Sequence, residues 1–160
     1  MQETIEIRQA RDSDATMISA LISELAVYFT PPHQDTIAAW FASSITPSAI
    51  TENIRHEKFS YLVACSGKTL AGVIAMRDTT HVHHLFVAPA WQRRGIATRL
   101  WQRAKAAALA TGKVKGFSVR SSEYAVPVYE SFGFRVAGER SEKKGIAFVP
   151  MTLHVETVQV

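Results

Sequence analysis

Apolar and polar positions follow two different periods along this chain, and each period predicts its own type of element. Short runs with alternating or continuous apolar residues are typical of β-strands. The segments with this pattern are 4–8, 59–65, 70–76, 81–87, 114–119, 134–137 and 146–155. The turn-like residues 66–69 separate two of these runs, which predicts a β-hairpin over 59–76.

Other segments repeat apolar residues every three or four positions, which predicts helices. The first has a stripe that consists of Ile18, Leu21, Ile22, Leu25 and Phe29. Asp12 or Ser13 is expected to cap this helix, and Pro31-Pro32 to end it. A second helical region covers residues 37–41, and a third begins at Thr46-Pro47, with Thr as cap and Pro in the first turn. These last two could be one broken helix.

The clearest helix follows the strand at 81–87. Its apolar stripe consists of Ile96, Leu100, Trp101, Ala104 and Ala108. It should end near Thr111-Gly112, because glycine readily adopts the left-handed conformation that closes a helix. A shorter helix should run through Tyr129. The order of elements predicts one domain over residues 1–160, with a mixed α/β fold (α+β) and a mainly antiparallel central sheet flanked by helices.

Composition narrows the class of protein. The 160 residues are 47% hydrophobic and 20% charged, as in soluble globular domains, and no apolar run could span a bilayer. The first residues have no signal-peptide pattern, and the single Cys65 cannot form an internal disulfide, so we expect a cytoplasmic protein without membrane partners. The net charge of +4 is mild, and no nucleic-acid-binding module accompanies it, so no nucleic-acid partner is expected.

Candidate chemistry begins in the basic turn before the clearest helix. Arg93 and Arg94 precede Gly95, and Arg99 and Arg103 follow on the helix. A helix N-terminus carries unpaired amide groups and partial positive charge, so this turn is suited to bind a phosphate group. Neither G-x-x-x-x-G-K-[ST] nor G-x-G-x-x-G is present, which excludes two common phosphate-binding motifs.

Two motifs carry a family resemblance. The run Gln92-Arg93-Arg94-Gly95-Ile96-Ala97 resembles the Gln/Arg-x-x-Gly-x-Gly/Ala signature of the GNAT N-acetyltransferases. Residues 125–134 are similar to the A-x-x-x-Y-x-x-x-G-F pattern of the same family. The resemblance implies a GNAT-like fold and acetyl-CoA as co-substrate, with no metal. It predicts cofactor contacts at Leu85, Phe86, Val87, Gln92, Arg93, Arg94, Gly95, Ile96, Ala97, Thr98, Ser122 and Tyr129.

These predicted contacts differ in kind. The turn amides at 92–98 would bind the pyrophosphate, and the backbone of residues 85–87 would pair with the pantetheine arm where the GNAT sheet splays. Relatives commonly have Asn around residues 120–122, and Ser122 is also well suited to cap the following helix.

The implied reaction is transfer of an acetyl group to a primary amine of a small molecule or peptide, by direct attack. Such a reaction needs an acid for the leaving thiolate and a base for the amine. Tyr129 occupies the tyrosine position of the second motif and is the predicted acid. His81 and His83 fall where arylalkylamine N-acetyltransferases carry a His-x-His pair, and one of them is the candidate base.

The sequence also predicts the orientation and the ionisation of the three histidines. His81 and His83 should share a strand face and His84 should point to the other, since side chains alternate along a strand. Imidazole titrates near neutral pH without special tuning. Three histidines in four residues resemble metal ligands, but no further ligand lies nearby in sequence, so a metal site is not predicted.

The sequence does not identify the acceptor amine. Tyr28, Phe29, Trp40 and Phe41 could line its pocket, although aromatic residues at helical spacing are more often core. Transfer of a different acyl group, a non-catalytic acyl-CoA-binding regulator and a nucleic-acid-binding protein with pI near 9.4 are the alternatives. A monomer and a homodimer are both compatible with the sequence.

Overall fold

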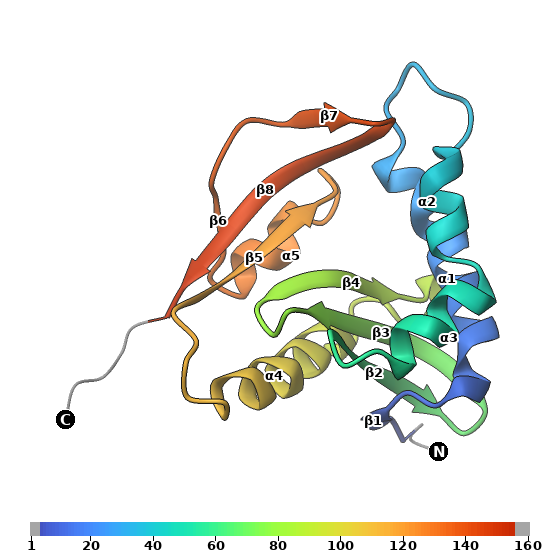
Figure 1. The fold of residues 1–160 in the computed structure, drawn as a ribbon, viewed down its shortest axis with the longest axis vertical. Helices are drawn as coiled ribbons and strands as arrows, with labels where there is room; N and C mark the ends of the chain where they lie inside the picture. Colours follow the sequence, from blue (N-terminus) through green and yellow to red (C-terminus); the bar gives the residue numbers. More distant parts are fainter. Residues whose placement is uncertain (1–3, 156–160) are drawn as a thin grey trace.

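One open sheet runs through the molecule (Figure 1). The computed structural model describes residues 4–155. The sheet has the strand order β1-β2-β3-β4-β5-β8-β6, and β7 pairs with β8. The strands are β1 (Glu6–Gln9), β2 (Phe59–Ser66), β3 (Thr69–Arg77), β4 (His81–Val87), β5 (Gly116–Ser121), β6 (Arg135–Val136), β7 (Ser141–Lys143) and β8 (Ile146–His154).

Neighbouring strands of this sheet are antiparallel except at one place. Strands β4 and β5 run parallel, because the chain crosses over through α4 before it returns to the sheet. The predicted mixed α/β fold with a mainly antiparallel sheet is confirmed, as is the hairpin of β2 and β3.

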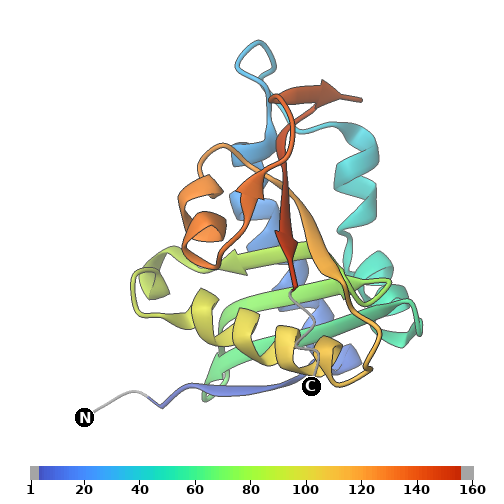
Figure 2. The same ribbon diagram turned by 90° about the vertical axis from the view of Figure 1, so that its left-hand side faces the viewer.

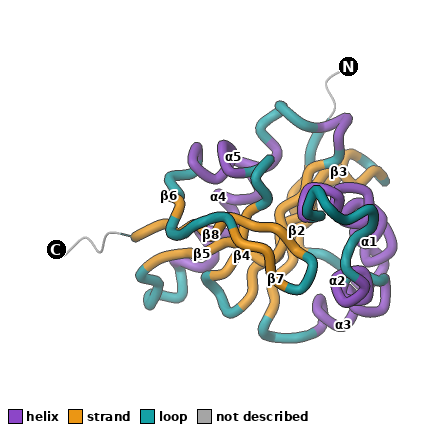
Figure 3. Tube along the Cα trace, turned by 90° about the horizontal axis from the view of Figure 1, so that it is seen from above, coloured by secondary structure: helices purple, strands orange, loops and turns teal. Residues whose placement is uncertain are grey.

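The helices cover both faces of strands β2 to β4. They are α1 (Ala15–Leu25), α2 (Ala39–Ser44), α3 (Pro47–Arg55), α4 (Ile96–Leu109) and α5 (Val126–Ser131), with short 3₁₀ helices η1 (Asp12–Asp14), η2 (Ala26–Phe29) and η3 (Pro89–Trp91). Helix α4 lies across one face (Figure 2). Seen from above, α1, α2 and α3 gather on the side of the strands away from α5 (Figure 3).

Two hydrophobic cores result from this layering. The α4 stripe, with Leu100 and Trp101 buried, packs against alternate residues of β3 such as Ile74. The α1 stripe, with Ile18 and Ile22 buried, packs with residues that point the other way from β3, such as Val73. Because successive strand residues face opposite sides, one buried strand serves both cores.

Most predicted elements occur, with shifts at their ends. Thr46 accepts a hydrogen bond from the Ala49 amide at 3.2 Å, so the predicted cap of α3 is confirmed. The cap expected at Asp12 or Ser13 is wrong, because both residues lie inside η1. Asp14 instead accepts from the Arg11 amide at 2.7 Å and forms an ion pair with Arg8 at 2.8 Å.

The last part of the chain differs most from its prediction. The charged segment 140–145, expected to be a loop, contains β7, which forms a hairpin with β8. The strand expected at 134–137 is only Arg135–Val136. Lys144 and Gly145 both have positive φ, and this sharp turn lets β7 fold back onto β8.

Candidate active site

The sheet opens between its two parallel strands. β4 and β5 pair only at His81 with Ser118 and Val82 with Val119. Beyond these pairs β4 continues beside β3 and β5 continues beside β8, so the edges that face each other have no partner strand. A cavity of about 1360 Å³ lies at this opening and is lined by residues from both parts of the sheet.

The turn before α4 has the backbone geometry that the sequence suggested. Arg93 and Gly95 both have positive φ, 64° and 77°. The hydrogen-bonded ladder of α4 begins with the Arg99 amide, which donates to the Gly95 carbonyl at 3.1 Å. The amides of residues 96–98 precede it, and the first turn has no acidic side chain. Such a helix start attracts anions.

The polar side chains in and after this turn contact different parts of the protein. The Gln92 amide donates from Nε2 to the Val87 carbonyl at 3.0 Å, which ties the turn to the end of β4. The Arg94 guanidinium lies over the Trp91 ring, 4.8 Å from its centre. The Arg99 guanidinium donates to the Ile5 carbonyl at 3.3 Å, so it is directed to the start of β1.

The predicted cofactor contacts come together with one exception. Arg94 is absent from the cavity lining, because its side chain turns back over Trp91. The other predicted contacts line the cavity, namely Leu85, Phe86, Val87, Gln92, Arg93, Gly95, Ile96, Ala97, Thr98, Ser122 and Tyr129.

Ser122 also has an internal role. Its Oγ accepts a hydrogen bond from the Ala125 amide at 3.2 Å, in the turn that leads into α5. The side chain is 3% exposed. This bond stabilises the turn before α5. The N-cap residue of α5 is Ala125, without a side-chain cap, so the expectation that Ser122 caps the helix is wrong.

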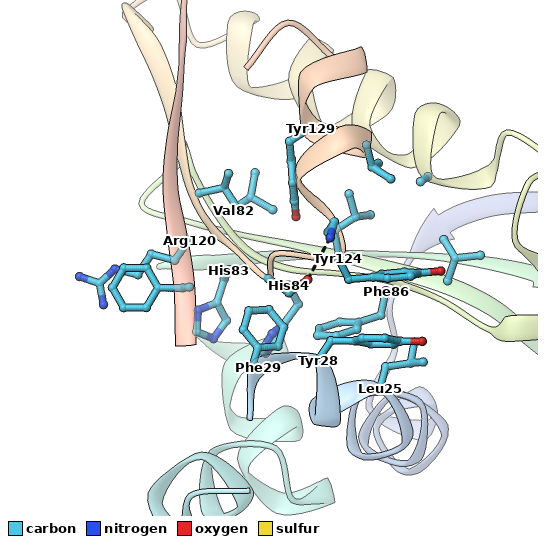
Figure 4. Close-up of a pocket in the computed structure, with 18 of the residues that line it drawn as sticks. Leu25, Tyr28, Phe29, Val82, His83, His84, Phe86, Arg120, Tyr124 and Tyr129 are labelled. Carbon is cyan, nitrogen blue, oxygen red and sulfur yellow. Dashed lines mark hydrogen bonds between the residues drawn. The ribbon is translucent and has the colours of Figure 1, made fainter. Parts of the chain in front are cut away.

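Tyr129 projects from α5 into the cavity, opposite Tyr28 and Phe29 (Figure 4). Its ring packs edge-on against Phe132 and Phe134. Within residues 4–155 the hydroxyl has no hydrogen-bond partner. Burial raises the pKa of Tyr129 well above its usual value, because the phenolate would be poorly solvated. The hydroxyl stays protonated and is available as a donor.

The histidines of β4 are arranged by a register shift. Ala75 pairs with His84 and Met76 with Val82, so His83 has no partner across the β3 ladder. An extra residue of this kind disturbs the alternation of side chains. The rings of His83 and His84 consequently lie beside each other, 4.1 Å between centres. The expectation that His84 points to the other face is wrong.

His81 and His83 both line the cavity, in different environments. His81 Nδ1 lies 2.8 Å from Ser118 Oγ on β5, a hydrogen bond that fixes the orientation of the imidazole. His83 contacts the Phe59 ring, 5.0 Å between centres. His84 is 5% exposed, and its Nε2 has no partner in the described part of the chain.

Burial lowers the pKa of both candidate bases to about 4. Arg77 lowers the pKa of each further, because a cation nearby disfavours the imidazolium. Arg120 has the same effect on His81, and Lys58 on His83. The expectation that these groups titrate near imidazole's ordinary pKa is therefore wrong for the unliganded protein.

The aromatic residues of the early helices do reach the cavity. Tyr28, Phe29, Trp40 and Phe41 all line it. The Tyr28 ring stacks on Tyr124 from the β5–α5 connection, 4.3 Å between centres and 16° between planes. This pair joins the N-terminal helices to the second half of the sheet.

Sequence reasoning missed several lining or supporting groups. Ser118 could have been suspected as a polar residue in an apolar strand. Arg120 and Tyr124 gave no local signal, since both lie far along the chain from β4. Arg77 is paired with His81 across the β3–β4 hairpin and could have been suspected from that hairpin.

Metal-ligand clusters and membrane-spanning helices are both absent from the described residues. No group of three or more His, Cys, Asp or Glu side chains in residues 4–155 is arranged to hold a metal ion. Among the described helices, none is both long and apolar enough to cross a bilayer.

Comparison with known proteins matches this architecture. A family model for the GNAT acetyltransferase domain matches residues 28–155. A GCN5-related N-acetyltransferase from Rhodopseudomonas palustris has a TM-score of 0.78 and 18% identity, with 97% of this chain and 98% of that one covered. No curated protein matches the sequence.

Two other solved structures contain coenzyme A or its acetyl ester. PaiA N-acetyltransferase from Thermoplasma acidophilum, in complex with coenzyme A, has a TM-score of 0.77 and 16% identity over 95% of this chain and 99% of that chain. YncA from Salmonella typhimurium, with acetyl-CoA, has a TM-score of 0.74 and 19% identity over 98% and 97%. At such identities the likeness concerns the fold.

Proposed function

Since the chain belongs to the GNAT acetyltransferase family, we propose that it transfers the acetyl group of acetyl-CoA to a primary amine of a small molecule or peptide. The observation that carries this proposal is the single cavity at the sheet opening. It joins the turn at 92–98, the unpaired edge of β4, the hydroxyl of Tyr129 and the imidazoles of His81 and His83.

The residues present fit coenzyme A in chemical character. The amides at the start of α4 and the side chain of Arg93 suit a pyrophosphate, because both present positive charge to the cavity. The free edge of β4 at residues 85–87 suits the amides of the pantetheine arm, since an extended chain can pair there as a strand would. Acetyl-CoA itself supplies the activated thioester.

Tyr129 is the proposed general acid. In the reaction the amine nitrogen bonds to the carbonyl carbon, the carbon–sulfur bond breaks and the sulfur requires a proton. The Tyr129 hydroxyl lies at the cavity without another hydrogen-bond partner in residues 4–155, so it can direct its proton to the sulfur. Its raised pKa makes it a weak acid, which suits a strongly basic thiolate that forms in a buried site.

His81 and His83 are proposed to receive the amine proton, directly or through water. With pKa values of about 4 they are neutral at physiological pH, so an imidazole lone pair is available. They are weak bases, however, and suit a nitrogen that has already begun to attack and become acidic. The Ser118 hydrogen bond makes His81 the better oriented of the two.

The test is a screen of amines, amino acids and peptides for release of coenzyme A from acetyl-CoA. Amine-dependent release, with an acetyl-CoA-dependent rise in thermal stability, supports the proposal. Stabilisation without release by any acceptor would favour a non-catalytic acyl-CoA-binding protein. Faster release from a different acyl-CoA would instead assign another acyl group.

A further inference from the structure

The charged residues that line the cavity all have the same sign. They are Arg77, Arg93, Arg120, Lys143 and Lys144, and no Asp or Glu of the described chain is among the lining residues. Arg93 belongs to the turn before α4. The other four lie at the end of β3, on β5 and at the β7–β8 turn, away from that turn in the chain. The acceptor side of the cavity is therefore cationic.

Two of these cations are close to the candidate base. Arg77 and Arg120 both act electrostatically on His81. Arg120 lies over the Phe148 ring at 5.0 Å, at one edge of the cavity (Figure 4), and has no ion pair or hydrogen-bond partner for its side chain in residues 4–155. Arg77 has one long contact, 3.8 Å to the carboxylate of Asp78.

Nearby carboxylates are engaged elsewhere. Glu142 accepts from Arg140 at 3.1 Å and contacts His33 at 3.4 Å. Glu123 forms an ion pair with the same arginine. Neither of them lines the cavity. Arg120 is thus available to an anion from outside the protein, and Arg77 competes for such an anion only with its long contact to Asp78.

The rest of this side of the cavity is aromatic. Phe29 contacts Phe41 and Phe86 with ring centres 6.2 Å apart, and Trp40 packs edge-on against Phe41. Trp40 is held in place by the hydrogen bond from its indole to the Lys144 carbonyl. These rings offer an apolar surface beside the cationic rim.

We propose that the acceptor is a primary amine which also carries a carboxylate on an apolar or aromatic body, as in an apolar amino acid, and that Arg77 and Arg120 bind that carboxylate. The inference rests on the proposed acetyltransferase function and narrows its acceptor. A polyamine fits poorly, because its second ammonium group would meet cations and no carboxylate.

The same charges assist the chemistry. Burial is the main reason that the pKa of His81 is low; Arg77 and Arg120 lower it further, and Asp78 opposes them. The same burial and cations would favour the neutral form of an amine bound beside His81. The acceptor nitrogen can therefore lose its proton in this cavity without a strongly basic side chain. This accounts for a site whose candidate bases are weak.

The experiment compares acceptors that differ only in the carboxylate. Phenylalanine, leucine and tryptophan are assayed beside the corresponding decarboxylated amines and beside spermidine, with kcat/KM for release of coenzyme A as the readout. We expect each amino acid to exceed its decarboxylated partner by about 10- to 100-fold, the range of a charge-assisted hydrogen bond.

Variants assign the effect to the two arginines. The double change Arg77→Gln plus Arg120→Gln should remove most of the preference, through KM. The decarboxylated amines should lose less, because they lose only the effect of the two charges on the neutral amine and on His81. The double change Lys113→Gln plus Arg135→Gln, at two exposed cations outside the cavity, is the charge-matched control and should keep the preference.

Outcomes separate this inference from the function on which it rests. The inference alone is overturned if the decarboxylated amines or spermidine are turned over as well as the amino acids or better. It is also overturned if other amines react and no amino acid in the panel does. Binding of acetyl-CoA without release by any amine overturns the proposed function and the inference together.

Discussion

The two sides of the cavity are built in opposite ways. The proposed cofactor side consists largely of consecutive residues, 85–98, and it offers main-chain groups at a strand edge and a helix start. The acceptor side is assembled from side chains of η2, α2, β3, β5 and the β7–β8 hairpin. A local main-chain site has a recognisable sequence motif, whereas a composite side-chain site can vary residue by residue.

The largest effect should come from the group that joins the two sides. Tyr129→Phe removes only the hydroxyl, so acetyl-CoA should still bind while turnover falls roughly 100- to 1000-fold, as is typical when a general acid is lost. Steady-state kinetics and an acetyl-CoA thermal shift measure the two separately. Tyr124→Phe, also in the cavity, keeps the ring stack and should lose little. Wild-type turnover in Tyr129→Phe would mean that another group protonates the sulfur.

The cofactor side should depend on its left-handed glycine. Gly95→Val adds a side chain that meets no atom within 4 Å, but at φ of 77° a β-branched residue is strained. The turn should relax away from this geometry and weaken acetyl-CoA binding by about 10- to 100-fold, from the usual cost of such strain. Titration of the thermal shift gives the affinity.

Gly112→Val is the matched control. Gly112, after α4, has φ of 83° and equally open surroundings, but it lies outside the cavity. Both variants should lose similar stability, and only Gly95→Val should lose acetyl-CoA affinity. Loss of affinity in both would show that general destabilisation is responsible.

The next prediction tests the two histidines on the acceptor side of the cavity. The double change His81→Gln plus His83→Gln should reduce turnover more than either single change, by about 10-fold or more if one imidazole can replace the other. Because the pKa of both histidines is about 4, the plot of turnover against pH should show no histidine ionisation near pH 6.5. An ionisation near pH 6.5 that is seen in the wild type and disappears in the double variant would show that bound substrates restore an ordinary imidazole pKa. Unchanged turnover would remove the pair as base.

The last expected effect concerns the stability of the fold, not turnover, as a function of pH. His81 and His83 have folded pKa values of about 4, below the unfolded value of about 6.5. Between these values the unfolded chain binds more protons, so stability is lost as the pH falls from 6.5 to 4. Thermal unfolding should therefore show a Tm that decreases across this window in the wild type. The double glutamine variant should have a flatter profile, and an equally steep one would contradict the assignment.

The elements that form the proposed cofactor side could be predicted closely from the sequence. The helix stripe, the turn at Gly95 and the position of Tyr129 all depend on residues near each other in the chain. The side of β4 on which His84 lies could not be predicted, because it depends on the register between β3 and β4. A register is set by pairing across the whole ladder and leaves no mark at the histidines themselves.

The acceptor side was only partly predictable for the same physical reason. The aromatic residues of the early helices could be proposed, but periodicity did not separate cavity wall from core. A charged residue on a strand is common, so neither Arg77 nor Arg120 stood out in the sequence. Arg77 is paired with His81 in the β3–β4 hairpin, whereas Arg120 approaches His81 only through the pairing of β4 with β5. The cap at Asp14 was missed because its partner Arg8 lies on β1.

The brief pairing of β4 with β5 has a consequence for cooperativity. Within the described residues 4–155, only two strand pairs connect the hydrogen-bond ladder of β1–β4 with that of β5, β8 and β6, so the halves depend on side-chain packing for much of their coupling. A molecule that pairs with the free edge of β4 and contacts α5 would act as an additional cross-link. Ligand binding would then do more than raise the Tm: it would make the two halves unfold as one unit, and amide exchange in β5 and β8 would slow to the rate of the β2–β3 hairpin.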